Sequence, residues 1–283
     1  MGIGTVSNQS STLYIVATPI GNLGDMTPRA IEVLASASVV AAEDTRHTRQ
    51  LLQHFQVEAD LLSLHEHNER ERCDGLLQRL AAGDSVALVS DAGTPAISDP
   101  GFVLVREARR AGYEVVSVPG ACALIAALSI AGLPTDRFVF DGFLPHKRGA
   151  RQQVYARYLR ESRTAVLYES SHRIAQSLAD LVEVLGGERM IAVARELTKR
   201  YETVLSGTAQ EVLAQVEDDD KQRKGEFVVL INGVEVVPSI DVGLEAVLRP
   251  LAEALPPKKA AAVASQITGC RKKEAYDFLL SLK

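Results

Sequence analysis

Short apolar runs alternate with amphipathic segments along most of the chain. Runs of four or five apolar residues are typical of buried strands, whereas apolar residues every three or four positions are typical of helices. Strands are predicted at residues 13–17, 39–42, 61–64, 85–89 and 114–118, and helices at 27–37, 44–55, 68–82, 101–111 and 121–131. Because the two kinds of element alternate, we expect a mainly parallel sheet in an α/β fold.

The sequence Leu-Pro-Thr-Asp at residues 133–136 interrupts this pattern and predicts an inter-domain link. A second βα set follows, with strands at 138–142, 164–168, 190–194 and 227–232 and helices at 150–161, 171–185 and 209–217. Helical segments at 244–255, 258–267 and 272–282 then predict a small helix-turn-helix-like tail. We therefore expect a disordered start over 1–12, α/β domains over 13–134 and 135–237, and a tail over 238–283.

The composition narrows the class of protein. Apolar residues make up 46% of the 283 residues, enough for a substantial core, and the net charge of −5 gives no general attraction to nucleic acid. Three widely spaced cysteines predict free thiols in a reducing compartment and no zinc knuckle. The first residues do not resemble a signal peptide, and the apolar run at 121–133 is too short for a membrane span of ~20 residues. The expectation is a soluble cytoplasmic protein without membrane contact.

Two stretches carry positive charge on this acidic chain. Residues 147–163 hold six basic residues and one acidic residue, a net charge of +5. Residues 256–283 hold six basic and two acidic residues, a net charge of +4. Each stretch is either a solvated helix face or a phosphate-binding surface. Tyr155 and Tyr158, which lie among the arginines, are candidates for base stacking or for the core.

The loop at residues 89–101 has the composition of a ligand-binding loop. It holds two glycines, two prolines and two aspartates between a predicted strand and a predicted helix. Such loops lie at the carboxyl ends of strands, where open α/β sheets bind ligands. Asp99 is expected to cap the helix that follows, with Pro100 in its first turn. Neither a G-x-G-x-x-G nor a P-loop pattern is present, which argues against a Rossmann dehydrogenase or a P-loop enzyme.

Polar clusters follow several other predicted strands. Residues 43–49 are either a capped helix start or an active-site cluster, and spacing favours the helix start. His65 and His67 have no evident third ligand, so no metal site is predicted. The clusters at 168–173, 195–200 and 224–226 suggest a ligand-facing rim in the second half.

Taken together, these motifs resemble the tetrapyrrole-methylase superfamily of S-adenosylmethionine (SAM) methyltransferases, over nearly the whole chain from Leu13. The motifs are Ala-Thr-Pro-Ile-Gly-Asn-Leu-Gly-Asp at 17–25, Ala-Glu-Asp-Thr-Arg at 42–46, Val-Ser-Asp-Ala-Gly-Thr-Pro at 89–95, Pro-Gly at 119–120, Tyr-Glu-Ser at 168–170, Arg-Glu-Leu-Thr-Lys at 195–199 and Lys-Gly-Glu-Phe at 224–227. The resemblance implies two α/β domains with SAM in the cleft between them, and a homodimer. It also implies 2′-O-methylation of a cytidine ribose in the 16S rRNA of the small ribosomal subunit.

The resemblance also implies roles for individual residues. The SAM-binding residues would be Pro19, Ile20, Asp91, Thr94, Ala121, Cys122, Tyr168, Thr198 and Gly225. The candidates for activating the ribose hydroxyl are Glu43, Asp44, Arg46 and Lys199, and the sequence does not choose among them. Ser171 and the tripeptide at 200–202 depart from the family pattern. The alternatives are a relative that methylates a tetrapyrrole or a protein side chain, and a non-catalytic RNA-binding assembly protein.

Overall fold

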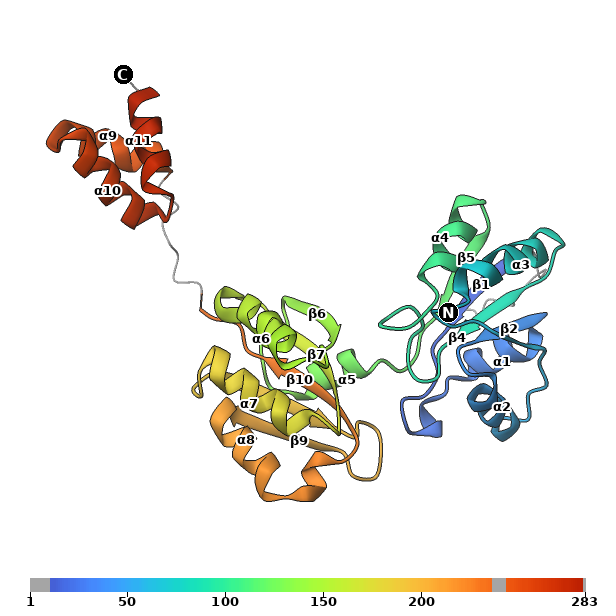
Figure 1. Cartoon of the computed structure of the whole chain (residues 1–283). Coiled ribbons are helices and arrows are strands. Elements are labelled where there is room, and N and C mark those ends of the chain that lie inside the picture. The colour runs from blue at the N-terminus through green and yellow to red at the C-terminus, as the bar shows by residue number, and fades with distance from the viewer. Residues whose placement is uncertain (1–10, 236–242, 282–283) are drawn as a thin grey trace, which may run out of the picture. The chain divides into compact units, whose positions relative to one another are not determined.

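The computed structural model describes residues 11–235 and 243–281. The chain divides into two compact units at Val234 and Glu235. The first unit contains two five-stranded sheets with their helices, and the second contains three helices (Figure 1). The predicted disordered start lies outside the described residues up to residue 10, and Thr12 is already the first residue of a strand.

The first sheet is fully parallel, as predicted, with the strand order β3-β2-β4-β1-β5. Its strands are β1 (Thr12–Val16), β2 (Val39–Ala42), β3 (Leu61–Ser63), β4 (Val86–Val89) and β5 (Glu114–Val118). Its helices are α1 (Pro28–Ser36), α2 (Thr45–His54), α3 (Glu69–Ala81) and α4 (Phe102–Arg110), with a 3-10 turn η1 (Leu23–Asp25). Val40 packs in the cluster with α1 and α2, and Val39 packs in the cluster with α3 and α4. Both faces of the sheet are therefore buried, which explains its uninterrupted apolar strands.

The start of α4 differs from the prediction. The N-cap residue is Gly101, at φ +129°, and not Asp99. The buried carboxylate of Glu69 on α3 accepts the N–H groups of Gly101 at 3.0 Å and Val103 at 2.9 Å. A Cβ atom on Gly101 would stand 2.6 Å from Leu88 Cδ2. Helix α4 is thus capped by a residue 32 positions earlier in the chain, and the carboxylate of Asp99 is left for another role.

The second sheet is mostly antiparallel, and the extension of the parallel pattern to this half was wrong. Its order is β6-β7-β10-β8-β9, and of these pairs only β6 and β7 are parallel. The strands are β6 (Phe138–Phe143), β7 (Thr164–Ser170), β8 (Met190–Arg195), β9 (Thr203–Thr208) and β10 (Glu226–Ile231). Strand β9 was missed because its sequence, TVLSGT, is short, contains glycine and lies half exposed at the sheet edge. Between β8 and β9 lies a short loop without a helical crossover, so the chain returns antiparallel.

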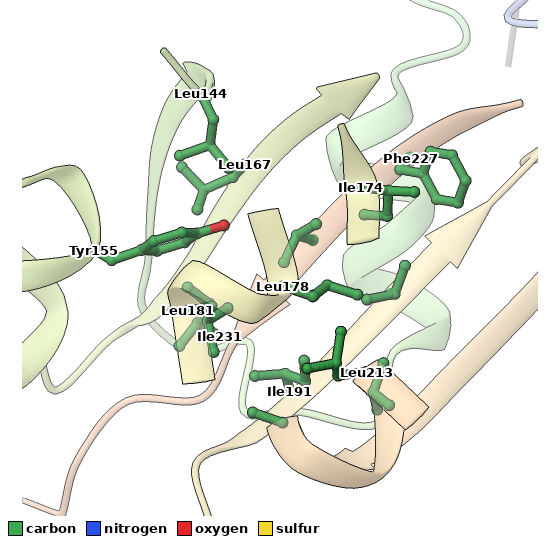
Figure 2. Close-up of a cluster of buried hydrophobic side chains, with 14 of the residues drawn as sticks. Leu144, Tyr155, Leu167, Ile174, Leu178, Leu181, Ile191, Leu213, Phe227 and Ile231 are labelled. Atoms are coloured by element: carbon green, nitrogen blue, oxygen red, sulfur yellow. The ribbon is translucent and has the colours of Figure 1, made fainter. Parts of the chain in front are cut away.

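Helices cover both faces of the second sheet. One face packs against α6 (Arg148–Arg157), η2 (Tyr158–Arg160), α7 (Ile174–Leu185) and α8 (Ala209–Asp218), which η3 (Asp220–Arg223) follows. Figure 2 shows the core of this layer, where Tyr155, Leu167, Leu178 and Ile191 converge. The other face packs against α5 (Ala123–Ile130) (Figure 1). Helix α5 precedes the predicted link at 133–136, yet its Ala127 and Leu128 belong to the cluster of the second sheet.

The basic stretch at 147–163 is largely structural. Arg151 is 2% exposed, and its guanidinium pairs with the buried Asp180 at 2.5 Å. Arg148 pairs with Asp180 and with Glu183. Tyr155 and Tyr158 are core residues, with hydroxyls bonded to Ser177 and Asp141. The core alternative therefore holds for both tyrosines. In contrast, the side chains at 157 and 160 are exposed arginines.

The second unit is a bundle of α9 (Leu244–Ala254), α10 (Pro257–Thr268) and α11 (Lys272–Ser281) (Figure 1). Its core is built on small residues, with Ala260, Ala261 and Ala264 of α10 packed against Leu248 and Leu279. Gly269 adopts the left-handed conformation at φ +72° that ends α10 and allows the turn into α11. Its basic side chains at 258, 259 and 271–273 are all exposed. None of the described helices of the chain is long and apolar enough to cross a bilayer.

Candidate functional site

A cavity of about 560 Å³ lies in the first unit. Its wall combines the loops that follow β1, β2 and β4 with the start of α5 and the ends of β7 and β10. Seven of the thirteen residues singled out from the sequence line it: Ile20, Glu43, Asp91, Thr94, Cys122, Tyr168 and Gly225. Loops that are far apart in the sequence therefore meet at one site, at the carboxyl edge of the first sheet.

Three further SAM-binding candidates flank this lining. Pro19 directly precedes Ile20. The carbonyl of Ala121 accepts the hydroxyl of Thr94 at 3.0 Å, which joins the β4 loop to the start of α5. Thr198 adopts a left-handed conformation at φ +66°, and its buried Oγ1 has no hydrogen-bond partner among the described residues.

The loop after β4 is tied to its neighbours by backbone hydrogen bonds. Thr18 and Gly93 exchange N–H to carbonyl bonds of 2.9 and 3.1 Å. Gly93 is at φ +89°, where a Cβ atom would press against Ile20 at 3.3 Å. The carboxylate of Asp91 accepts the N–H of Asp44 at 3.0 Å, and so ties the β4 loop to the start of α2. Glycine at 93 and aspartate at 91 thus shape one wall of the cavity.

Three carboxylates face this cavity: Glu43, Asp91 and Asp99. Burial raises the pKa of Asp99 to about 6, against a weaker lowering by its hydrogen bond with Ser90. Burial also raises the pKa of Glu43, and the negative charges of Asp99 and Asp91 add to the effect. No group of side chains in the described part of the chain is suited to hold a metal ion. The cluster is therefore suited to accepting protons near neutral pH.

Asp44 and Arg46 have a structural role at the start of α2. Asp44 is the N-cap, and its carboxylate accepts the N–H of Arg46 at 2.8 Å. The same carboxylate pairs with the guanidinium of Arg46, whose side chain is 84% exposed. This hydrogen bonding lowers the pKa of Asp44. Within the described residues, both side chains lie outside the cavity lining.

The second-sheet wall of the cavity contains Tyr168, whose hydroxyl accepts the N–H of Leu124 at 3.2 Å. Burial raises the pKa of Tyr168 to about 12, so the hydroxyl stays protonated at neutral pH. The side chain of Cys122 makes no capping bond to the described part of α5. The N-terminus of α5 therefore presents amide groups to a cavity that Cys122 and Ala123 line.

Lys199 lies in the loop between β8 and β9, outside the described cavity lining. Its ammonium group pairs with Glu196 at 2.9 Å and Glu226 at 2.7 Å. Its aliphatic stem lies over Gly21, where a Cβ atom would stand only 2.5 Å from Lys199 Cε. Lys199 thus connects this loop to the loop after β1.

A turn at residues 170–173 brings Ser171 and His172 to the cavity. The buried Glu169 holds this turn, because its Oε1 accepts the N–H of Ser170 and pairs with Arg173 at 2.8 Å. The Arg173 guanidinium also contacts His146 Nδ1. The carboxylate of Glu169 is therefore occupied in organising the turn.

Asp99, Ser98 and Phe143 line the cavity and are absent from the set of candidates from the sequence. Asp99 lies in the loop at 89–101, but it was assigned to a helix cap. Phe143 lies one residue beyond the predicted strand 138–142, in a segment without a polar motif. Its signal was an aromatic residue directly after a glycine at a strand end.

Solved structures of two methyltransferases share this fold. A cobalt precorrin-4 methyltransferase of cobalamin biosynthesis superposes with a TM-score of 0.55 at 18% identity, covering 81% of this chain and 98% of that chain. A uroporphyrin-III-C-methyltransferase from Thermus thermophilus superposes with a TM-score of 0.55 at 22% identity, covering 78% and 94%. At such identities the likeness defines the fold, which is that of the tetrapyrrole methyltransferases.

Sequence comparison gives the family. Residues 12–213 match the model of the tetrapyrrole (corrin/porphyrin) methylases, and residues 238–283 match the RsmI C-terminal HTH domain. The ribosomal RNA small subunit methyltransferase I of Xylella fastidiosa strain Temecula1 is 53% identical over 267 residues, covering 94% of this chain and 97% of that protein. Its namesake in Escherichia coli O157:H7 is 50% identical over 279 residues, covering 98% and 97%. The chain belongs to the tetrapyrrole methylases and, within them, to the ribosomal RNA small subunit methyltransferase I family.

Proposed function

We propose that this methyltransferase transfers a methyl group from SAM to the 2′-hydroxyl of a cytidine in 16S rRNA. The observation that carries the proposal is the cavity, where the candidate SAM residues meet three carboxylates. Relatives about half identical over nearly their full length are named for methylation of small-subunit ribosomal RNA. The proposed protein is a cytoplasmic homodimer.

The cavity is suited to SAM in size and lining. Its volume of about 560 Å³ lies within the range typical of small-molecule sites. The amides at the start of α5 suit the methionine carboxylate, because a helix N-terminus favours anions. We assign side-chain contacts to Ile20, Asp91, Thr94, Cys122 and Tyr168, and backbone contacts to Pro19, Ala121, Thr198 and Gly225. Bound there, SAM supplies an electrophilic methyl group, and the protein positions the acceptor.

The ribose hydroxyl must lose its proton as it accepts the methyl group. Of the four candidates from the sequence, Glu43 faces the cavity, whereas Asp44, Arg46 and Lys199 are paired outside its described lining. Asp99 joins Glu43 there, and its pKa of about 6 leaves it mostly ionised and still basic at neutral pH. We assign proton acceptance to Asp99, supported by Glu43. Asp44, Arg46 and Lys199 keep the surrounding loops in place.

RNA capture is assigned to the second unit. Its exposed basic side chains at 258, 259 and 271–273 carry positive charge on an acidic chain. The paired arginines of α6 contribute less than their number suggests, because Arg148 and Arg151 are neutralised within the fold. This basic bundle favours an RNA substrate over a tetrapyrrole or a protein side chain.

Two measurements test this proposal. The first is ribose-methyl mapping of 16S rRNA from small subunits lacking the modification, after incubation with wild-type enzyme and SAM. One newly methylated cytidine is expected, and methylation confined to a base or to protein would contradict the proposal. The second is calorimetric titration of SAM into wild-type, Asp91→Ala and Asp91→Asn enzyme. Asn keeps an acceptor for the Asp44 N–H and should retain more affinity than Ala. Equal affinities in all three would remove Asp91 from the SAM site.

A further inference from the structure

Two large apolar side chains of the cavity wall are exposed. Phe143 is 61% exposed and Ile97 is 39% exposed, and both line the cavity. They come from opposite halves of the first unit, since Phe143 ends β6 and Ile97 lies in the loop before α4. Ser98 and Gly142 adjoin, because a Cβ atom on Gly142 would stand 2.8 Å from Ser98 Oγ. Ile97 and Phe143, the next residues along each chain segment, are therefore parts of one apolar rim.

A β-bulge puts Phe143 in this position. Phe140 pairs with Val166, and the next pair is Phe143 with Tyr168, so β6 uses three residues where β7 uses two. Gly142 takes the left-handed conformation at φ +68° that the bulge requires. A regular strand would place residue 142 opposite Tyr168. Bulges beside active sites re-aim a side chain, and this one brings an aromatic ring to the cavity.

The Phe143 ring is supported from within the protein. It meets the Tyr168 ring edge-to-face, with centroids 5.3 Å apart, and Phe140 meets the same tyrosine at 4.9 Å. These contacts anchor Phe143 while more than half of the residue remains exposed. An aromatic ring that is fixed in place and exposed beside a cavity is suited to stacking on a flat ligand.

We propose that Phe143 is the platform on which the nucleobase of the acceptor cytidine stacks, which holds the attached ribose at the cavity. The inference rests on the proposed function and names a subsite within it. Proteins recognise unpaired RNA bases by stacking them on aromatic side chains. The carboxylates of Glu43 and Asp99 belong to the same cavity, so a base held at its rim leaves the ribose hydroxyl within the reach of a proton acceptor.

The test compares Phe143→Ala, Phe143→Leu and Phe143→Trp on the small subunit that the wild-type enzyme methylates. Stacking on one base predicts that Phe143→Ala lowers kcat/KM for RNA by about 5- to 160-fold. Phe143→Leu keeps apolar area without a π face and should be impaired, whereas Phe143→Trp should retain activity. The affinity for SAM should stay within about twofold of wild type in all three variants.

The matched control is Phe138→Ala, since Phe138 begins the same strand, is 40% exposed and lies outside the described cavity lining. A second readout uses an RNA fragment with pyrrolocytidine at the acceptor position, whose fluorescence is quenched by stacking. Quenching by wild type and its loss with Phe143→Ala would support the platform.

Three outcomes would overturn it: unchanged quenching, equal kcat/KM for Phe143→Ala and Phe138→Ala, or a loss of SAM affinity that accounts for the whole defect. The last would assign the ring to the adenine of SAM. Failure of the wild-type enzyme to methylate any cytidine ribose would instead refute the proposed function.

Discussion

Glu69 offers the sharpest test of how distant residues shape the cavity. Its carboxylate, on α3, receives the N–H groups of Gly101 and Val103 at 3.0 and 2.9 Å, and that of Leu104 at 3.4 Å. The residue is 8% exposed, so neither water nor another described residue readily replaces it. Glu69→Ala therefore leaves the first turn of α4 without its acceptor, directly after the loop that carries Asp99.

The magnitude follows from these bonds. A hydrogen bond to a charged group contributes about 1.5–3 kcal/mol, so losing the two short bonds costs about 3–5 kcal/mol. Removal of the carboxylate also ends its own burial cost, which reduces the expected loss in the free energy of unfolding to about 2–3 kcal/mol. Glu69→Gln keeps an acceptor oxygen without the charge and should lose about 1 kcal/mol.

Urea unfolding followed by circular dichroism measures this loss, with Glu71→Ala as the control. Glu71 lies in the same first turn of α3 but is exposed, so its replacement should change the free energy of unfolding by less than about 0.5 kcal/mol. Methyl transfer by Glu69→Ala should also fall below that of Glu71→Ala. Equal stability and equal turnover in the two variants would refute the assignment of Glu69 as the cap of α4.

Three further predictions concern charge. The pKa of Asp99, about 6, predicts that kcat/KM rises with pH through this value and that Asp99→Asn lowers turnover and removes this dependence; a retained dependence would exclude Asp99. Because that pKa is raised, the ionised group costs stability above pH 6, and thermal unfolding at pH 7.5 should show Asp99→Asn more stable than wild type. Arg151→Ala should destabilise the protein by about 3–5 kcal/mol in urea by leaving Asp180 buried and unpaired, whereas the exposed Arg157→Ala should be nearly neutral; equal effects would contradict a structural Arg151. Deletion of residues 239–283 should spare SAM binding, weaken RNA binding and flatten its salt dependence by up to about 0.9 per lost phosphate contact; identical salt series would assign the bundle to another role.

Periodicity predicted the elements of the first sheet well because its strands are buried on both faces and alternate with capped helices. Val39–Ala42 and Glu114–Val118 match their predicted bounds, and Thr27 caps α1 as its position indicated. The same reasoning failed at β9, because a half-exposed edge strand does not leave an apolar run. It also failed for strand direction in the second sheet, which depends on the crossover between strands more than on the strands themselves.

The candidate site was partly predictable for a related reason. Ile20, Asp91 and Thr94 lie in loops directly after strands, and parallel topology brings such loops to one edge. Asp99 was misassigned because an aspartate before a proline and a glycine looks like a local cap, whereas the true cap, Glu69, is distant in sequence. The distinction between Glu43, in the cavity, and Asp44, on the helix cap, requires side-chain directions that spacing does not contain.

The packing of α5 has a consequence for engineering. In the chain order this helix ends the first α/β half, but its apolar side chains are buried against the strands of the second sheet. A chimera of two family members joined at residues 133–136 would separate α5 from the sheet with which it co-evolves in volume, and would mismatch Leu128 and Val228. A junction at Pro119–Gly120, before the helix, keeps that interface within one parent. The natural unit of exchange is therefore the second sheet together with the helix that precedes it.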